Sequence, residues 1–534
     1  MIRTCADPGD PLVGCPPFWD LCIVGAGAAG LALAAEFLGT AWRVLVLESG
    51  LREPDAGSTA LNCLDSVGLR HDGWNEGRVR ALGGTTRAWG GQLVPLRASE
   101  LAERPWIAGS GWPLTLAELQ PYYRRVEHML GTRGPPYDEE VWRRIGVPAP
   151  ALDPEQLCVR FSQWAPLGRR NFAVLLRRQL EASDNVTVLL GATVTAVCCV
   201  AGGSHCDSIT ARTLDRSREI SIQARSFVVA CGGLESARLL LSSPGPDHRG
   251  VANRSHCVGR YFQDHISWIA GEIESAARSS VQHLFDPRYV GGTMYSVKLE
   301  PTDAELQRRG WLNAMGHVAF QIPEALGWME VRRILRSVQG GRLELPSGDE
   351  LRALLRGSVE LTRLILTRYI ASRRRSPDSG AIRLLVDVEQ APNPLSRITL
   401  TGSTDALGVA RAQLDWRVTD LEVRTMTGFA RTLADQIERL GLGRVRLAAG
   451  PDFSARETLG AARDIFHHMG TTRMSRSPED GVTRPDLRCH DVDNLYIAGP
   501  SVFPTSGIAN PTFTALALSL RLADHLKTLT PGSG

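Results

Sequence analysis

Residues 19–50 read WDLCIVGAGAAGLALAAEFLGTAWRVLVLESG, and this stretch decides the fold class. Its apolar run at 21–24 predicts a buried strand, and the alanine- and leucine-rich stretch up to about residue 38 predicts a helix. A second apolar run, at 44–47, predicts another strand of the same sheet. A strand, a glycine-rich turn, a helix and a second strand in this order are typical of a Rossmann-like α/β fold.

The turn itself, GAGAAG at 25–30, has the glycine spacing of a dinucleotide-binding loop. Gly25 permits the tight turn, Gly27 lets the backbone approach a diphosphate, and Gly30 lets the helix lie close to the strand. The free amides at the start of the helix favour an anion. Glu48, at the end of the second strand, is placed to accept hydrogen bonds from a ribose and would repel a 2′-phosphate. The turn therefore predicts a site for FAD or NAD rather than NADP.

Later segments favour FAD, which is the more extended cofactor. Residues 80–91 (RALGGTTRAWGG) form a glycine-rich loop that could bring amides against a diphosphate and a flavin edge. Residues 185–197 and 226–241 read as later strands of the same sheet, the second of which opens a helix, and 494–499 read as a further buried strand. A nucleotide domain that collects strands from both ends of the chain suits a deeply buried cofactor.

Composition narrows the class of protein. A chain of 534 residues is too long for one core and predicts two domains. The net charge of only +3 argues against a dedicated nucleic-acid binder. No apolar run is long enough for a transmembrane segment, and residues 1–18 hold no apolar signal core. The eleven cysteines show no metal-ligand spacing, so we expect reduced thiols, no metal site and a cytoplasmic protein.

Two segments near the C-terminus carry residues suited to alcohol oxidation. Residues 466–474 read FHHMGTTRM, and residues 506–518 read SGIANPTFTALAL. A histidine can take the hydroxyl proton because its pKa lies near neutral pH, and Asn510 can hold the substrate oxygen. Pro511 suits the first position of the helix that follows. The residues alone also allow a packed histidine pair, half of a metal site beside Asp464, or a plain Asn-Pro helix start.

Together these segments resemble the glucose–methanol–choline (GMC) family of flavoprotein oxidoreductases. The resemblance rests on motifs in the family's order: GAGAAG with Glu48, LGGTTRAWGG, VVACGGLESARLLL, VGRYFQDH at 258–265, HHMGTTRM, and NLYIAGPSVFPTSGIANPTFTALALSLRLADHL. The pairing of HHMGT with SGxANPTxT is the most specific part. The pattern is most similar to the sugar-oxidising branch that contains pyranose 2-oxidase and fructose dehydrogenase-like enzymes.

The resemblance implies roles for single residues. His467, four positions before the Thr of HxxGT, would be the base for the alcohol proton, and flavin N5 would accept the hydride. Asn510 would bind the substrate oxygen, whereas His468 falls on a variable position. Thr471, Gly470 and Pro511 would shape the surroundings of the flavin ring. Pyranose 2-oxidase bonds its flavin covalently to a histidine whose position here is Ala88, so we expect non-covalent FAD.

The motifs and the resemblance together predict the FAD-binding residues. They are Gly25, Gly27, Ala28, Ala29, Gly30, Glu48, Gly83, Gly84, Thr85, Trp89, Gly90, Gly91, Val194, Gly232, Gly499, Pro511 and Thr512.

The FAD-binding domain is expected to be discontinuous, with residues 1–100, 155–270 and 455–534. Residues 101–154 would form a partly irregular cover, and 271–454 an α+β substrate domain. Alternation at 397–400 and 410–418 predicts strands of an antiparallel sheet roofing the flavin.

Residues 331–376 stand out within the predicted substrate domain, because they hold eleven arginines against four acids. A solvated lid or helical hairpin is favoured over a helix that docks on a membrane, an anionic substrate or an electron-transfer partner.

The expected activity is FAD-dependent oxidation of a hydroxyl to a carbonyl on a sugar or sugar-containing small molecule, such as an aminoglycoside. Two other functions stay open at this point. One is a non-redox lyase on the same fold, and the other is a flavoprotein electron-transfer subunit of a larger dehydrogenase.

Overall fold

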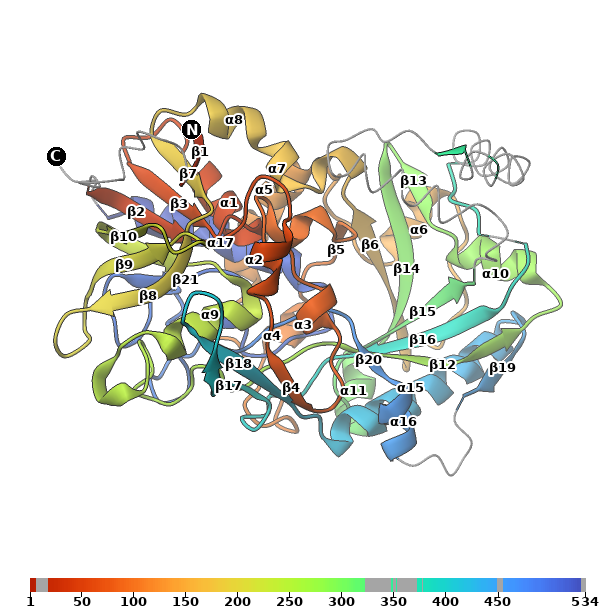
Figure 1. Cartoon of the computed structure of the whole chain (residues 1–534). Helices are drawn as coiled ribbons and strands as arrows, with labels where there is room; N and C mark the ends of the chain where they lie inside the picture. The colour runs from red at the N-terminus through yellow and green to blue at the C-terminus, as the bar shows by residue number, and fades with distance from the viewer. Residues whose placement is uncertain are drawn as a thin grey trace.

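The computed structural model describes residues 1–5, 18–321, 347, 348, 352, 372–376, 378–448 and 455–529. Two sheets dominate it, one at the left of Figure 1 near both chain ends and a larger one at the right. The arginine-rich stretch 331–376 lies almost wholly outside the described residues, so its predicted role cannot be placed on the fold. Within the described part, Arg373 pairs with the buried Asp286 at 2.6 Å.

The left-hand sheet has six parallel strands in the order β1-β7-β3-β2-β11-β21. Its strands are β1 Ile2–Thr4, β2 Trp19–Val24, β3 Val44–Glu48, β7 Val186–Leu190, β11 Ala224–Val229 and β21 Leu495–Ile497. Every residue of β2 and β3 is buried, as the unbroken apolar runs predict for a sheet covered on both faces. The predicted α/β class and the gathering of strands from both chain ends are confirmed.

The right-hand sheet has nine strands, all paired antiparallel. They are β5 Gln92–Leu93, β6 Leu157–Trp164, β12 Ile266–Glu274, β13 Arg288–Val290, β14 Thr293–Pro301, β15 Ala314–Phe320, β16 Ile382–Val388, β19 Arg444–Leu447 and β20 Arg463–Asp464. The helix α15 (Asp420–Arg439) covers one face, since a Cβ on Gly316 of β15 would lie 2.4 Å from the Leu433 side chain. The other face is turned toward the active site.

Two three-stranded sheets complete the β-structure of the described residues and correct one prediction about the parallel sheet. The first holds β8 Thr193–Cys199, β9 Cys206–Arg212 and β10 Glu219–Ile222, and the second holds β4 Asp65–Gly68, β17 Arg397–Thr404 and β18 Ala410–Trp416. The stretch 185–197 is therefore divided, because β7 joins the parallel sheet and β8 does not. The strands expected at 397–400 and 410–418 are β17 and β18, which pair antiparallel with each other as predicted, and β18 also pairs in parallel with β4.

Helices connect the two large sheets. They are α1 Ala28–Ala35, α2 Ala56–Ala60, α3 Gly73–Glu76, α4 Ala98–Leu101, α5 Leu116–Leu130, α6 Glu140–Ile145, α7 Phe172–Leu175, α8 Arg177–Ala182, α9 Gly232–Ser242, α10 Arg278–Phe285, α11 Asp303–Arg309, α15, α16 Ala455–Ala461 and α17 Pro511–Lys527, with short 3₁₀ turns η1 Gly84–Arg87, η2 Leu167–Arg169, η3 Pro246–His248 and η5 Pro500–Val502.

The predicted domain ranges stay a prediction, and the structure shows where they divide single sheets. β6 and β20 fall in the ranges assigned to the FAD domain, yet both pair within the nine-stranded sheet. The expected cover, 101–154, contains α5, whose Tyr123 bonds to Thr514 of α17 at 2.8 Å. Among the described residues, no helix has the length and apolar character needed to span a membrane.

Candidate active site

One cavity lies between the end of the parallel sheet and the FHHMG segment. It is lined by the predicted residues Gly25, Gly27, Ala28, Ala29, Glu48, Gly84, Thr85, Val194, Gly232, Gly499, Pro511, Thr512 and His467. These residues come from eight separate stretches of the chain, and the fold brings them around one space.

At the nucleotide end the wall is made of backbone. The helix α1 begins after Gly27, which has no side-chain cap, so its first amides are free to face an anion. A Cβ added to Gly27 would meet nothing within 4 Å, whereas one on Gly30 would lie 1.9 Å from the carbonyl oxygen of Gly25. Gly27 therefore leaves open space, and Gly30 permits close contact between helix and turn.

Glu48 lies at the same end with 6% of its surface exposed. One carboxylate oxygen accepts the amide hydrogen of Ala26 at 2.9 Å and the other accepts that of Gly50 at 2.8 Å. Burial raises the pKa of Glu48, against the effect of these two amides. The predicted ribose acceptor thus also fixes the shape of the glycine turn.

Some predicted cofactor residues do not line the cavity. Gly30, Gly83, Trp89, Gly90 and Gly91 support it from behind. Gly83 donates its amide to the Ala26 carbonyl at 2.9 Å, and the Trp89 indole donates to the Arg170 carbonyl at 2.8 Å. Gly83 thus ties the loop 80–91 to the GAGAAG turn, and Trp89 ties the same loop to the segment before α7.

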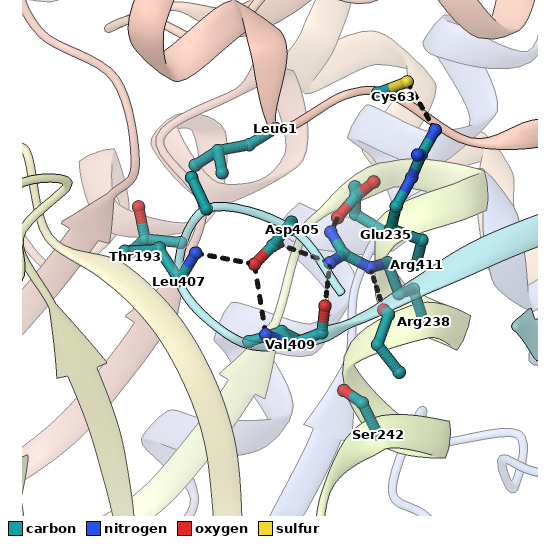
Figure 2. A network of polar contacts seen from close by, with 12 residues as sticks. Leu61, Cys63, Thr193, Glu235, Arg238, Ser242, Asp405, Leu407, Val409 and Arg411 are labelled. Atoms are coloured by element: carbon teal, nitrogen blue, oxygen red, sulfur yellow. Dashed lines mark hydrogen bonds and ion pairs between the residues drawn. The ribbon is translucent and has the colours of Figure 1, made fainter. Parts of the chain in front are cut away.

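A charged network that the sequence did not reveal forms another part of the wall (Figure 2). Arg238 of α9 contacts Glu235 at 3.2 Å and Asp405 at 2.5 Å, and Asp405 also accepts the amides of Leu407 and Val409. Burial opposes the charge on Glu235, but the neighbouring arginines outweigh it and lower its pKa to about 2. The network fixes the β17–β18 turn against α9.

Arg78 and Arg80 complete this network, each 2.8 Å from Glu235. The three arginines and two carboxylates leave this wall with one more positive than negative charge. A site for a diphosphate gains from such an excess.

At the other end, the segment 466–470 makes a sharp bend. Phe466 has a positive φ of 69° and Gly470 one of 84°, and a Cβ on Gly470 would lie 2.2 Å from the Tyr261 carbonyl oxygen. A non-glycine residue in the left-handed region is strained, and such strain concentrates at functional sites. Phe466 is 43% exposed although it lines the cavity, so it offers an uncovered apolar ring there.

His467 is held from three directions. Its backbone amide donates to the Asp264 carboxylate at 2.9 Å, its Nδ1 lies 2.9 Å from Nδ1 of His265, and its Nε2 lies 3.4 Å from Nδ2 of Asn510. Asn510 precedes α17, and Pro511 occupies the first turn of that helix, as the sequence predicts. Both predicted catalytic residues are therefore side by side.

These contacts determine which nitrogen of His467 is free. Nε2 of His265 lies 2.8 Å from the Gly507 carbonyl, which can only accept, so this nitrogen carries the hydrogen. With both rings neutral, Nδ1 of His265 is an acceptor and Nδ1 of His467 donates to it. Nε2 of His467 then has a lone pair that points to Asn510.

The electrostatics keep His467 neutral. Burial is the largest cause, followed by His265, and together they lower the pKa of His467 to about 4 against the opposing charges of Asp264 and Asp387. An imidazole with this pKa is unprotonated at neutral pH and can accept a proton.

His468 belongs to a second cluster, which answers the question of the histidine pair. His71 donates to the Asp264 carboxylate at 3.0 Å, and Nε2 of His468 lies 3.9 Å from the same group. The amide of Trp74 points at Nδ1 of His71 at 3.3 Å, so the hydrogen of His71 is on Nε2, facing Asp264. A metal ion would need that nitrogen deprotonated, and the cluster is therefore better suited to hydrogen bonding than to metal binding.

Asp264, His265 and His71 are the residues that sequence reasoning missed. Asp264 and His265 end the motif VGRYFQDH, which carries the family resemblance but received no role. They act on a histidine some two hundred positions away, and no local pattern shows that contact. His71 has no sequence signal at all.

Comparisons with known proteins decide the family. The family models for the N- and C-terminal parts of GMC oxidoreductases match residues 74–267 and 392–519. The chain belongs to the GMC oxidoreductase family. It is an oxidoreductase, and members of the family are FAD flavoproteins.

Among curated relatives of this GMC oxidoreductase, paromamine 6'-oxidase from Streptomyces fradiae is 27% identical over 95% of this chain and 90% of its own. The 6'''-hydroxyparomomycin C oxidase from Streptomyces lividus is 27% identical, with 95% and 92% covered. The fructose dehydrogenase large subunit from Gluconobacter japonicus is 23% identical, with 95% and 97% covered.

Solved structures agree on the fold. Formate oxidase superposes with a TM-score of 0.58 at 18% identity, covering 96% of this chain and 98% of its own. Pyridoxine 4-oxidase from Mesorbium loti gives 0.57 at 18% identity, with 96% and 100% covered.

The cavity fits FAD. Gly27 leaves room beside the free amides of α1, where a side chain would intrude. The exposed ring of Phe466 offers an apolar contact, and Nε2 of the buried His468 has no hydrogen-bond partner among the described residues. An anionic diphosphate at one end and a flat ring with polar edges at the other would satisfy these features.

Proposed function

We propose that this enzyme oxidises a hydroxyl to a carbonyl on a sugar or sugar-containing small molecule, with FAD as its cofactor. The neutral imidazole of His467, with an unprotonated Nε2 beside the Asn510 amide, is the observation that carries the proposal. The relatives named above, which include paromamine 6'-oxidase, 6'''-hydroxyparomomycin C oxidase and a fructose dehydrogenase, support a sugar-like substrate.

The chain's own residues account for the proton. Nε2 of His467 takes the hydroxyl proton, and the Asn510 amide donates to the substrate oxygen and orients it. When bound, FAD supplies the acceptor for the hydride that leaves the same carbon. Loss of one proton and one hydride converts the CH–OH group to a carbonyl, so the step balances.

Non-covalent binding of FAD is part of the proposal. Ala88, at the position of the flavin-linking histidine in pyranose 2-oxidase, is an exposed residue at the end of η1 and has no group that could form the bond. Acid precipitation should leave all of the yellow colour in the supernatant, and a coloured pellet would contradict this part. The electron acceptor is unassigned, and a cytoplasmic location stays a prediction based on cysteine usage.

The test follows the visible flavin band of the purified protein without oxygen while sugars, aminosugars and polyols are added. Bleaching by one of them is expected, and air admitted afterwards distinguishes an oxidase from a dehydrogenase. A band that no hydroxyl compound bleaches would overturn the proposal in favour of a lyase or of an electron-transfer subunit.

A further inference from the structure

The face of the nine-stranded sheet that looks away from α15 carries an unexplained polar cluster. Side chains alternate between the faces of a strand, so His317 points away from α15 because its neighbour Gly316 points toward it. Gly316 pairs with Leu299, which places Lys298 opposite His317 on the next strand. Lys298, His317 and Asp387 thus stand on three adjacent strands, β14, β15 and β16.

This cluster shares a face with the catalytic histidine pair. Asp387 pairs with Ser267 at the start of β12, two residues after His265, so Asp387 and His265 point to the same side. His265 holds His467 at 2.9 Å. The Asp387 carboxylate is also close enough to His467 to raise its pKa electrostatically.

The cluster has buried polar atoms without partners. Oδ1 of Asp387 and Nδ1 of His317 make no hydrogen bond to any described residue, although Nδ1 lies 3.4 Å from the other oxygen of Asp387. Lys298 is 9% exposed, and burial lowers the pKa of its ammonium against the opposing charges of Asp387 and Glu300. Buried polar groups normally have partners, because an unpaired group costs free energy. A ligand with several hydroxyls would supply the missing ones.

We propose that Lys298, His317 and Asp387 form a subsite that binds two neighbouring hydroxyls of the sugar ring whose other hydroxyl is oxidised at His467. This inference rests on the proposed function and names the part of the substrate that is recognised. Asp387 accepts from one hydroxyl, Lys298 donates to the second, and the neutral His317 bonds to either.

The charges favour neutral hydroxyls over an ammonium group. Arg463 pairs with Ser267 across β20 and, like Lys298, acts electrostatically on His317. Lys298 and Arg463 are thus the cations near Asp387, whereas the other carboxylate that acts on Lys298, that of Glu300, is already paired with Arg160 at 3.2 Å. Burial and Lys298 lower the pKa of His317 to about 4, so this ring adds no charge at neutral pH.

The experiment compares the wild type with Asp387→Asn and Lys298→Met at pH 7.5. The ligands are the sugar that reduces the flavin fastest, its monodeoxy analogues and a short primary alcohol. We expect each substitution to raise the dissociation constant of the sugar about tenfold or more. The limiting rate of flavin reduction should stay within about twofold of the wild-type rate. The dissociation constant of the short alcohol should not change.

The deoxy analogues locate the contact. One analogue should bind equally well to the wild type and to Asp387→Asn, because it already lacks the hydroxyl that Asp387 accepts from.

Asp435→Asn is the matched control, since Asp435 is exposed on α15, behind the sheet. Equal losses for sugar and short alcohol, or no loss at all, would overturn the subsite. If the substitutions weakened the binding of aminosugars alone, the cluster would recognise an ammonium group and the proposed hydroxyl subsite would be wrong.

Calorimetry measures the binding of the same sugars to the FAD-loaded protein without any flavin reduction. It therefore separates a failure of the proposed oxidation from a failure of the proposed subsite. If no compound reduces the flavin but sugars bind and Asp387→Asn weakens them, the proposed oxidation fails and the subsite stands. If sugars reduce the flavin and both variants bind them normally, the subsite fails alone. If no sugar binds to the wild type, both fail.

Discussion

The two large sheets contribute to the candidate site with different chemistry. The parallel sheet contributes one short turn, where backbone amides and missing side chains do the work. The antiparallel side contributes side chains from distant segments, such as His265 just before β12 and Asp387 on β16. A backbone site should be sensitive to any added Cβ, whereas a side-chain site should be sensitive to the loss of single functional groups. The predictions below test this contrast.

The largest effect is expected at His467. His467→Ala removes the only described imidazole whose free nitrogen faces Asn510, so the rate of flavin reduction should fall by about a hundredfold or more. Rapid mixing of FAD-loaded protein with substrate in the absence of oxygen measures that rate. Flavin content should be unchanged, and His283→Ala, an exposed histidine on α10, is the control. Normal reduction by His467→Ala would remove this residue from the role of base.

The glycine turn offers a matched pair of substitutions. Gly30→Ala places a methyl group 1.9 Å from the Gly25 carbonyl oxygen, so the backbone must shift, and we expect the free energy of unfolding to fall by about 1–3 kcal/mol. Gly27→Ala meets no protein atom within 4 Å. It should leave the apoprotein stability unchanged and weaken FAD instead, because its methyl group enters the space meant for the diphosphate.

Thermal unfolding of the apoproteins and fluorescence titration with FAD measure the two quantities. If Gly27→Ala destabilised the apoprotein as much as Gly30→Ala does, Gly27 would have a packing role only. The contrast between a backbone site and a side-chain site would then be wrong.

His265 should act through His467 and is therefore a positioning residue. His265→Ala removes the acceptor for Nδ1–H of His467, so the ring loses its fixed tautomer, and we expect about a tenfold slower flavin reduction. Since His265 lowers the pKa of His467, the acid limb of the pH profile should also move upward. A rate loss without any change in the pH profile would indicate a structural role only.

The sequence allowed the nucleotide wall to be predicted because its information is local. GAGAAG, the flanking strands and Glu48 lie within thirty residues, and the helix after Asn510 follows from Pro511. The catalytic surroundings were predicted only as far as His467 and Asn510. Strand register and loop packing bring Asp264, His71 and Asp387 close to His467 and Asn510. A shift of one residue in register would place other side chains around these two residues. The assignment of β8 to the parallel sheet failed for the same reason, since strand patterns do not reveal the sheet that a strand joins.

The smallest effect is expected for pH, and it tests the electrostatics of the side-chain wall. With a pKa of about 4, His467 is almost entirely neutral at pH 5.5 and at pH 7.5, so the rate constant of flavin reduction should differ by less than about twofold between them. An imidazole with the ordinary pKa near 6.5 would lose about tenfold over that range. Below pH 4 the rate should fall tenfold per unit, because protonation removes the base. Folding adds a second readout: the folded pKa lies below the unfolded one, so stability should be fully present above pH 6.5 and decline as the pH falls toward 4. A rate that already drops near pH 6.5 would mean that burial and His265 do not keep His467 neutral, and that the tautomer deduced from the Gly507–His265–His467 contacts is wrong.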